Sequence, residues 1–223
     1  MSGSFQDAQR QQFSILATLE KKALIWFASK MPARVGPDHL TALGFLAQCG
    51  AGFCYAFSAA DPAFLHGVNL LIVLNWWGDS LDGTLARYRQ KLRPRYGFYI
   101  DHVCDTFGGL FLMGGLSFSG FITPALAWGM LLSFYLLSIL VYLGTYALGE
   151  FKMSFSWFGP TEIRLLLIVG NLVLLWKPKV HFLGHYLFLF DIGALCAIAG
   201  MVLMAGYSAI RNTAILYRQE RIR

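Results

Sequence analysis

Long apolar stretches alternate with short polar segments along most of this chain. The apolar stretches lie at about 40–60, 66–90, 98–121, 124–149, 161–177 and 185–212. Each is close to or longer than the roughly 20 residues that an α-helix needs to cross the hydrocarbon core of a bilayer. The pattern therefore predicts an all-α membrane protein with six transmembrane helices.

The N-terminal segment has a different pattern. Between residues 5 and 30, apolar residues recur at near-helical spacing among Gln, Lys and Glu residues. Such a segment is too polar to cross a bilayer, and we predict an amphipathic helix that lies in the membrane interface. The expected organisation is an interfacial helix and linker at 1–36, a six-helix transmembrane domain at 37–213 and a polar cytoplasmic tail at 214–223.

Composition also indicates a membrane protein. The 223 residues have a mean hydropathy of +0.54 and are 57% hydrophobic and only 13% charged, whereas about 25% of a soluble domain is charged.

Of the 18 Lys and Arg residues, only Lys177 and Lys179 fall on one side of the predicted bundle, and only Arg164 falls within a span. Because basic residues are retained on the cytoplasmic side, we expect both termini to be cytoplasmic. Size and basicity favour a bacterial or archaeal cytoplasmic membrane, and the loop-sized basic clusters argue against nucleic-acid binding.

Four aspartates lie at the cytoplasmic ends of the second and third predicted spans. A helix advances about 100° per residue, so Asp79 and Asp82 share one strip of the second span, and Asp101 and Asp105 share one strip of the third. Small residues continue the same strips: Gly83, Ala86, Gly97 and Gly108. Two antiparallel neighbours joined by a short loop can turn these strips toward each other. The sequence therefore predicts four carboxylates around a small volume at the cytoplasmic side.

Four carboxylates this close repel one another and are costly to desolvate. Divalent cations relieve the repulsion, and oxygen ligands suit magnesium, manganese or calcium. A carboxylate cage beside small residues is typical of two-metal phosphoryl chemistry, in which cations bridge a diphosphate. The other interpretation is a set of helix-end acids that pair with the arginines of the 87–95 loop. It explains one or two aspartates but not the four together.

The motif itself resembles a known signature. It reads Asp79-x2-Asp82-Gly83-x2-Ala86-Arg87, then a nine-residue spacer, then Gly97-x3-Asp101-x3-Asp105. This resembles the complete signature of the CDP-alcohol phosphotransferases, with every fixed position present. The similarity of organisation, from the surface helix through six spans, covers nearly the whole chain.

The resemblance implies a reaction in which an acceptor hydroxyl displaces CMP from a CDP-linked donor and a phosphodiester forms. Carried over by position, Asp79, Asp82 and Asp101 would be the main ligands of a divalent cation, Mg²⁺ or Mn²⁺, with two ions expected. Asp105 would be a ligand or near-ligand and also the general base. The CDP-binding residues implied by the same motif are Asp79, Gly83, Ala86, Arg87 and Gly97, with the small residues leaving room for cytidine.

One position departs from the family pattern. Members often carry Pro-Asn before the first span, followed by a Thr, whereas this chain has Pro37-Asp38 with Thr41 three residues further on. An aspartate can accept a hydrogen bond but offers no amide donor. Any nucleotide contact assigned to the usual Asn is therefore not carried over to Asp38.

The donor and the acceptor remain open at this point. We favour CDP-diacylglycerol as donor, attacked by a polar alcohol such as inositol phosphate, glycerol phosphate or serine. The alternative is a CDP-choline or CDP-ethanolamine type of enzyme acting on diacylglycerol or another lipid alcohol, because the run from Asp101 through His102 to Asp105 is similar to that of those enzymes. Candidate acceptor-binding residues are Lys152, Glu162, Arg164 and Arg211. Arg164 suits an anionic acceptor phosphate, or it pairs with Glu162 or an aspartate and orders the bundle.

Two further interpretations follow from the same segments. An ion or proton transporter would use the aspartates as a relay, but the second and third spans are apolar or glycine-rich beyond the motif. A non-catalytic scaffold would not need them at all. Glycines between 108 and 120 give the third span a small-residue face that permits a homodimer or close packing within one subunit.

Overall fold

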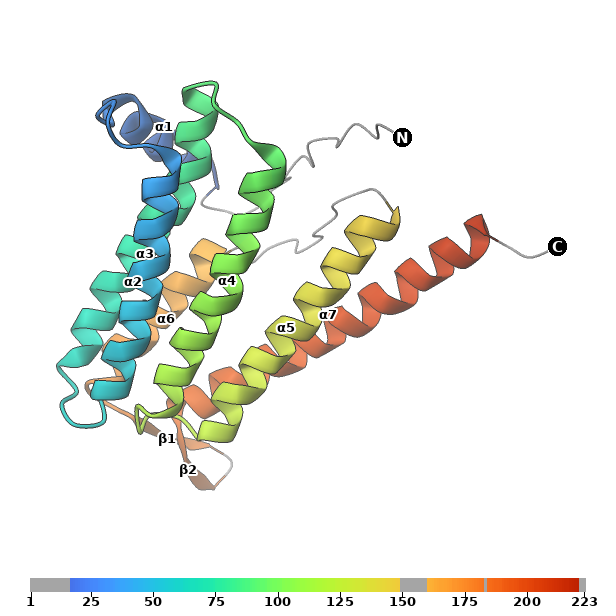
Figure 1. Cartoon of the computed structure of the whole chain (residues 1–223). Helices are drawn as coiled ribbons and strands as arrows, with labels where there is room; N and C mark the ends of the chain where they lie inside the picture. Colours follow the sequence, from blue (N-terminus) through green and yellow to red (C-terminus); the bar gives the residue numbers. More distant parts are fainter. Residues whose placement is uncertain (1–16, 149–159, 183, 221–223) are drawn as a thin grey trace.

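The computed structural model describes residues 17–148, 160–182 and 184–220, and this part of the chain is helical apart from one hairpin (Figure 1). Its elements follow one another as α1 (Ala17–Lys30), α2 (Pro37–Phe57), α3 (Phe64–Tyr88), α4 (Pro94–Ser117), α5 (Pro124–Leu148), α6 (Pro160–Leu174), β1 (Lys179–Phe182), β2 (His185–Phe188) and α7 (Leu189–Gln219). The all-α class predicted from the sequence is confirmed.

Helices α2 to α7 occupy the positions of the six predicted spans. Four of them begin at a proline: Pro37, Pro94, Pro124 and Pro160. Proline is favoured at the first helical position because its fixed φ suits the helix and its missing N–H would have no partner there. The prolines therefore set where these helices start, within a few residues of the predicted boundaries.

Three helices of the described ranges are long and apolar enough to cross a membrane: α2, α5 and α7. They indicate a membrane protein, but the predicted six transmembrane helices are not confirmed. The charged motif lowers the hydropathy of α3 and α4 at their facing ends. At 15 residues, α6 spans only about 22 Å at 1.5 Å per residue, less than the roughly 30 Å of the hydrocarbon core.

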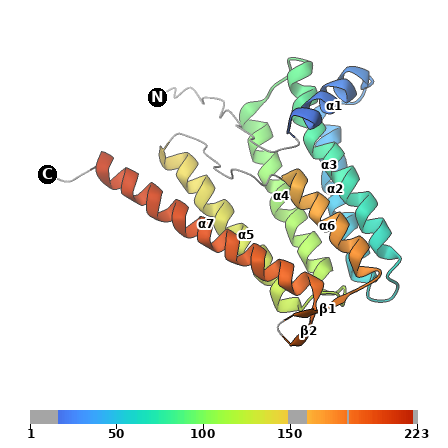
Figure 2. The ribbon, with the colours of Figure 1, turned by 180° about the vertical axis from the view of Figure 1, so that it is seen from behind.

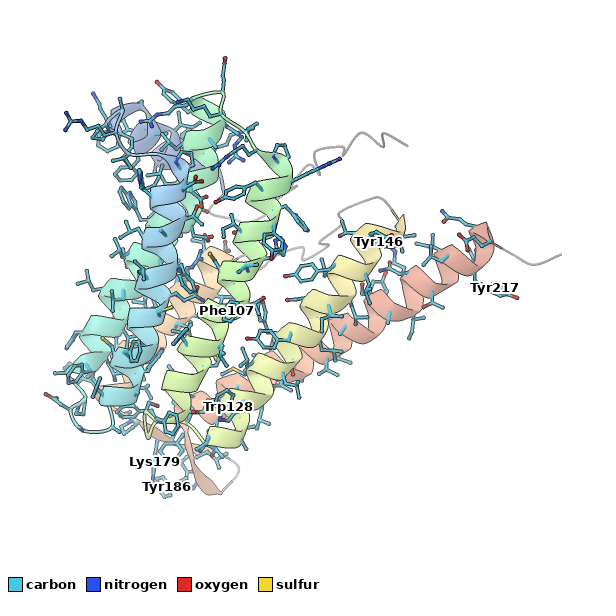
Figure 3. All side chains as sticks on the ribbon, in the orientation of Figure 1. Phe107, Trp128, Tyr146, Lys179, Tyr186 and Tyr217 are labelled. Carbon is cyan, nitrogen blue, oxygen red and sulfur yellow. The ribbon has the colours of Figure 1, made fainter. Side chains whose placement is uncertain are left out.

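The start of the last predicted span is wrong. Residues 185–188 form strand β2, which pairs antiparallel with β1, and α7 begins only at Leu189. Gly184 in the connection has a φ of +85°, a region that glycine adopts without steric cost. Hydropathy does not distinguish a short apolar strand from the first turn of an apolar helix. Lys179 and Tyr186 mark this hairpin at the end of the molecule opposite to the α3–α4 loop (Figure 3).

Glycines bring α2, α3 and α4 into backbone contact. A Cβ added to Gly78 of α3 would lie 2.7 Å from the Leu40 carbonyl oxygen of α2. A Cβ added to Gly115 of α4 would lie only 1.8 Å from the Gly52 carbonyl oxygen. Small residues permit this close approach of membrane helices. The glycine face of the third predicted span is thus used for packing within one subunit, and the homodimer stays a prediction.

The core lies mainly where α2, α3 and α4 meet α6 and the adjoining ends of α5 and α7. Tyr55 and Leu65 are fully buried there. The Tyr55 hydroxyl donates to Asn171 Oδ1 of α6 at 2.9 Å, and Asn171 Nδ2 donates to Asn69 Oδ1 at 2.8 Å. These bonds satisfy the buried polar groups of Tyr55 and Asn171, and they attach α6 to α2 and α3.

The N-terminal helix α1 packs beside the C-terminal end of α3, the end that we expect on the cytoplasmic side. Leu24 and Ala28 of α1 are buried in a second apolar cluster with Leu40, Leu81 and Leu85. On the other face of α1, Ile25 and Trp26 are 45% and 58% exposed. Two such faces fit a helix at an interface. The part of the predicted interfacial helix before residue 17 lies outside the described residues.

Helices α5 and α7 form a pair that leans away from the rest of the bundle. Both views show the C-terminal ends of these two helices displaced to one side of α2, α3 and α4 (Figures 1 and 2). At the hairpin end the pair joins the core, where Asp191 accepts hydrogen bonds from the Thr123 backbone N–H at 2.7 Å and hydroxyl at 2.8 Å.

Candidate active site

The α3–α4 connection determines where the four aspartates lie. Helix α3 ends at Tyr88 and α4 begins at Pro94, so the two antiparallel helices place Asp79 and Asp82 near Asp101 and Asp105. Arg89 holds the connection by donating to three backbone carbonyls after α1, those of Met31 at 2.9 Å, Pro32 at 2.8 Å and Val35 at 2.5 Å. One of the loop arginines thus caps backbone oxygens instead of pairing with the aspartates.

Three of the aspartates line one cavity. Asp79 of α3 and Asp101 and Asp105 of α4 surround it together with oxygen-bearing side chains that include Thr41 and Gln48 of α2. Its volume is about 10 Å³, which is about the space that one water molecule needs. The acidic strips predicted from the sequence therefore face a common space, and that space holds roughly one small ion or water.

Asp82 lies beside this cavity but does not line it. Its Oδ2 accepts a hydrogen bond from the Thr41 hydroxyl at 2.5 Å, and its Oδ1 accepts one from the Gly83 N–H. Asp82 is still close enough to Asp79 and Asp101 for charge repulsion. Cys104 lines the same cavity as Asp79, Asp101 and Asp105.

Arg164 from α6 reaches the aspartates across the bundle. Its Nη2 forms an ion pair with Asp79 Oδ2 at 2.6 Å, and its Nε donates to Asn75 Oδ1 at 3.0 Å. Asn75 is buried and donates in turn to the Gly44 carbonyl at 3.0 Å. The arginine that the sequence singled out in the fifth predicted span thus pairs with a motif aspartate, as one of its two interpretations predicted.

Glu20 of α1 was not singled out by the sequence. It accepts hydrogen bonds from Trp76 Nε1 at 2.9 Å and the Ser80 hydroxyl at 3.3 Å, both on α3. The Thr161 hydroxyl of α6 donates to both of its carboxylate oxygens, at 3.0 and 3.2 Å. Glu20 therefore attaches the first turn of α6 to α3, one turn from Arg164. A single glutamate in an amphipathic segment gave no signal for this role.

The glycines of the motif differ from the glycines at helix crossings. A Cβ on Gly97 would meet no atom within 4 Å, and one on Gly83 would meet only the Arg87 guanidinium at 3.7 Å. These two positions border open space instead of a packed backbone. Arg87 is exposed and donates to the Thr84 hydroxyl at 3.4 Å. Ala86, which precedes Arg87 on α3, is half-buried.

The remaining predicted residues are spread over the described chain. Asp38 is exposed and forms an ion pair with Arg93 of the α3–α4 loop. Glu162 is half-buried in the first turn of α6. Arg211 is exposed in the last third of α7, and Lys152 lies outside the described residues.

No ready-made metal site is present in residues 17–148, 160–182 and 184–220, where no three His, Cys, Asp or Glu side chains converge closely enough to hold an ion. The predicted cage of four aspartates is thus not preformed, because Asp79 pairs with Arg164 and Asp82 with Thr41. The cavity nevertheless has the carboxylate, amide and hydroxyl oxygens that hard divalent cations prefer. The donor set fits such a cation once these side chains rearrange.

The sequence was also compared with known proteins. Residues 34–207 match the family model described as CDP-alcohol phosphatidyltransferase. This region spans most of the chain and contains α2 through α6, the hairpin and the first part of α7. No curated protein matched the sequence.

Proposed function

The chain belongs to the CDP-alcohol phosphatidyltransferase family, and we propose that it uses CDP-diacylglycerol as donor. Members of the family transfer a phospho-alcohol group from a CDP-alcohol in phospholipid synthesis. The acceptor is a polar alcohol such as inositol phosphate, glycerol phosphate or serine, and CMP is released. The observation that supports phosphotransfer at these residues is the shared cavity of Asp79, Asp101 and Asp105, which come from the two helices that carry the motif.

Asp105 is the proposed catalytic base. Its carboxylate takes the proton of the acceptor hydroxyl while the acceptor oxygen attacks the phosphorus that carries diacylglycerol. A new P–O bond forms, the bond from that phosphorus to the CMP oxygen breaks, and CMP leaves with the electron pair. A positioned carboxylate contributes about 10²–10⁴-fold to a proton transfer of this kind.

The family generally depends on a divalent cation. In our proposal Asp79, Asp82 and Asp101, with Asp105, would hold Mg²⁺ or Mn²⁺, two ions in all. The positive charge of such ions would offset the negative charge of the diphosphate and of departing CMP. A chelator should therefore abolish CMP release, and added Mg²⁺ or Mn²⁺ should restore it.

We assign the CDP moiety to Asp79, Gly83, Ala86, Arg87 and Gly97. The open space beside Gly83 and Gly97 supports this assignment, because a bound group can approach the backbone there without displacing protein atoms. The Arg87 guanidinium is exposed close to Gly83, where it can donate to a donor phosphate.

Arg164 is the proposed contact for an acceptor phosphate, with Glu162, Lys152 and Arg211 as further candidates. If Asp79 held a cation, the Arg164 guanidinium, which pairs with Asp79 in this structure, would be available to bind an anionic acceptor. Arg164→Gln should then raise KM about 10–100-fold for a phosphate-bearing acceptor, the loss expected for a hydrogen bond to a charged group. KM for a neutral acceptor should change much less, and equal effects on both acceptors would contradict the assignment.

We further propose that the aspartates and both termini lie on the cytoplasmic side of a bacterial or archaeal membrane. The support is the concentration of Lys and Arg around α1, the α3–α4 loop and the C-terminal end, against Lys177 and Lys179 near the hairpin. Impermeant labelling of single cysteines in intact cells, one in the hairpin and one in the α3–α4 loop, tests this. Only the hairpin cysteine should react.

The test of the proposed function is a substrate panel. Purified protein in lipid vesicles is given CDP-diacylglycerol with each polar acceptor, or CDP-ethanolamine or CDP-choline with diacylglycerol, in Mg²⁺ or Mn²⁺. CMP release and the mass of the lipid product are measured. CDP-diacylglycerol should be the donor that yields product. Turnover only with a CDP-aminoalcohol would overturn the proposed donor. Ion flux that needs no nucleotide, without CMP release, would overturn the assignment as an enzyme.

A further inference from the structure

A second cavity lies between α2 and α4, next to the aspartates. Its volume is about 420 Å³, within the range of about 300–1,000 Å³ that small-molecule sites have. Ala42 and Phe45 line it from α2, and Ile100, Val103 and Phe107 line it from α4. These side chains offer no charge and no hydrogen-bonding group, so the cavity suits a hydrocarbon occupant.

The cavity is long and open along one side. From Tyr96 to Phe107 it follows about three turns of α4, roughly 16 Å. Phe107 lies about midway along α4 in Figure 3, and its side chain is 52% exposed. Because α2 is apolar and long enough to cross a membrane, this open side faces hydrocarbon when the helix is inserted. We call this cavity the α2–α4 groove.

The α2–α4 groove adjoins the aspartate cavity. Thr41, Phe45 and Cys104 line both. On α4 the two linings alternate, because Asp101 and Asp105 face the aspartate cavity while Ile100 and Val103 face the groove. A chain in the groove therefore has its polar end within reach of the reacting carboxylates.

Charged groups lie at the outer end of the groove. Asp38 lines this end and pairs with Arg93, whose guanidinium lies 4.2 Å from the centre of the Tyr96 ring. Such groups belong at the level of lipid headgroups, where charged and aromatic side chains gather. The groove thus runs from a polar rim into an apolar interior, which matches the order of headgroup and acyl chain in a lipid.

We propose that the α2–α4 groove binds one acyl chain of the lipid reactant, which under the proposed function is CDP-diacylglycerol, and so fixes the depth of its diphosphate beside the aspartates. The bilayer already solvates the chain, so the groove contributes position more than affinity. Misplacement of a reacting group by about 1 Å can cost up to 100-fold in rate.

The experiment fills the groove and varies the chain. Ala42→Trp and Val103→Trp place an indole in the groove, whereas Leu46→Trp on α2 is a matched control at a 65% exposed side chain outside it. With long-chain CDP-diacylglycerol, the two groove variants should lower kcat/KM about tenfold. A dihexanoyl donor, too short to reach Phe107, should be used equally well by all forms.

Two outcomes would overturn the groove proposal while leaving the proposed function intact, and a third would overturn both. Unchanged long-chain kinetics in both groove variants would remove the chain from the groove. Equal losses with long and short chains would instead indicate that the groove receives the nucleoside. Chain-length dependence seen only for diacylglycerol as acceptor would assign the groove to the other lipid reactant.

A binding measurement makes the proposal independent of turnover. Vesicles that contain a long-chain CDP-lipid with a diazirine at mid-chain are irradiated, and labelled peptides are identified by mass spectrometry. Label should fall on 96–107 and decrease in Ala42→Trp but not in Leu46→Trp. Label spread evenly over α5 and α7 as well would mean bulk lipid contact and would overturn the groove.

Discussion

The α2–α3–α4 unit and the α5–α7 pair are both helical and apolar, but they are packed in opposite ways. Of an apolar 18-residue stretch in each helix, 39% is buried in α2, against 17% in α5 and 17% in α7. Glycines bring the backbones of the first unit into contact, whereas added Cβ atoms on Gly193, Gly200 and Gly206 of α7 would meet nothing within 4 Å. The aspartates lie in the tightly packed unit, where the spacing of the helix backbones that carry them is fixed.

The difference follows from what each region must do. Carboxylates that repel one another keep their positions only where the surrounding backbone cannot relax. The α5–α7 pair instead presents large apolar side chains outward, including Leu143, Leu203 and Ile210, and its labelled end residues Tyr146 and Tyr217 are 92% and 68% exposed (Figure 3). Such a surface suits lipid contact. The comparison separates a rigid unit, which is the reactive unit under the proposed function, from a pair whose surface suits lipid contact.

The largest effect should come from one exchange made in both regions. Asp105→Asn in the α2–α3–α4 unit should lower CMP release about 10²–10⁴-fold, because the amide cannot accept the acceptor proton. Asp191→Asn in α7 removes a carboxylate that accepts two hydrogen bonds from Thr123 and lies outside the aspartate cavity. It should leave kcat within about twofold and lower the thermal midpoint instead.

The readouts are CMP release and thermal unfolding of the purified protein in detergent. Asp105→Asn should unfold at the wild-type temperature or above it, since one repelling charge is gone. CMP release by Asp105→Asn within tenfold of wild type would remove Asp105 from the base role. An equal loss of activity in Asp191→Asn would show that both carboxylates act only through the fold.

The sequence predicted the reactive unit better than it predicted how the unit is held. Spacing alone placed Asp79, Asp101 and Asp105 on facing strips, because helix geometry is local and regular. It could not assign the partner of Asp79, since Arg164 is 85 residues away and many pairings were compatible with the pattern. The Glu20 contacts with α3 and α6 depend on how α1 docks, which no local periodicity encodes.

Errors in the fold have a similar origin. Hydropathy located all six long apolar segments, and prolines marked four helix starts, but neither distinguished the strand at 185–188 from a helical turn. Nor did hydropathy reveal which helices lean apart. That arrangement follows from side-chain volumes at specific crossings, such as Gly52 on Gly115, which become visible only once the helices are paired.

The second prediction tests the tight packing itself. Gly115→Ala adds a Cβ where the Gly52 carbonyl oxygen would be 1.8 Å away, so α2 and α4 must separate. Overpacking of this kind costs about 1–3 kcal/mol or more, and the same shift should move the aspartates and reduce CMP release. Gly114→Ala is the neighbouring control, because its nearest atom would be a Trp128 ring carbon at 3.6 Å. Equal unfolding midpoints for the two variants would contradict the close crossing.

The third prediction concerns the contact that joins α1 to the reactive unit. Glu20→Ala leaves Trp76, Ser80 and Thr161 without their acceptor, at a cost of about 1–2 kcal/mol. Glu20→Gln keeps one carbonyl acceptor and should lose less than half of that. If Glu20 positions α6, then Glu20→Ala should also raise KM for a phosphate-bearing acceptor, as Arg164→Gln does. A lower midpoint with an unchanged KM would limit Glu20 to a structural role.

The smallest expected effect sharpens the other side of the comparison. Gly206→Ala places a methyl group on an exposed face of α7, where no described atom lies within 4 Å. Because alanine favours the helix over glycine by about 0.5–1 kcal/mol, the thermal midpoint should rise slightly and CMP release should not change. If the variant is instead destabilised as much as Gly115→Ala, that face must be packed against another chain. Such a result, with a change of mass in light scattering, would indicate the homodimer and would turn the lipid-facing pair into a protein interface.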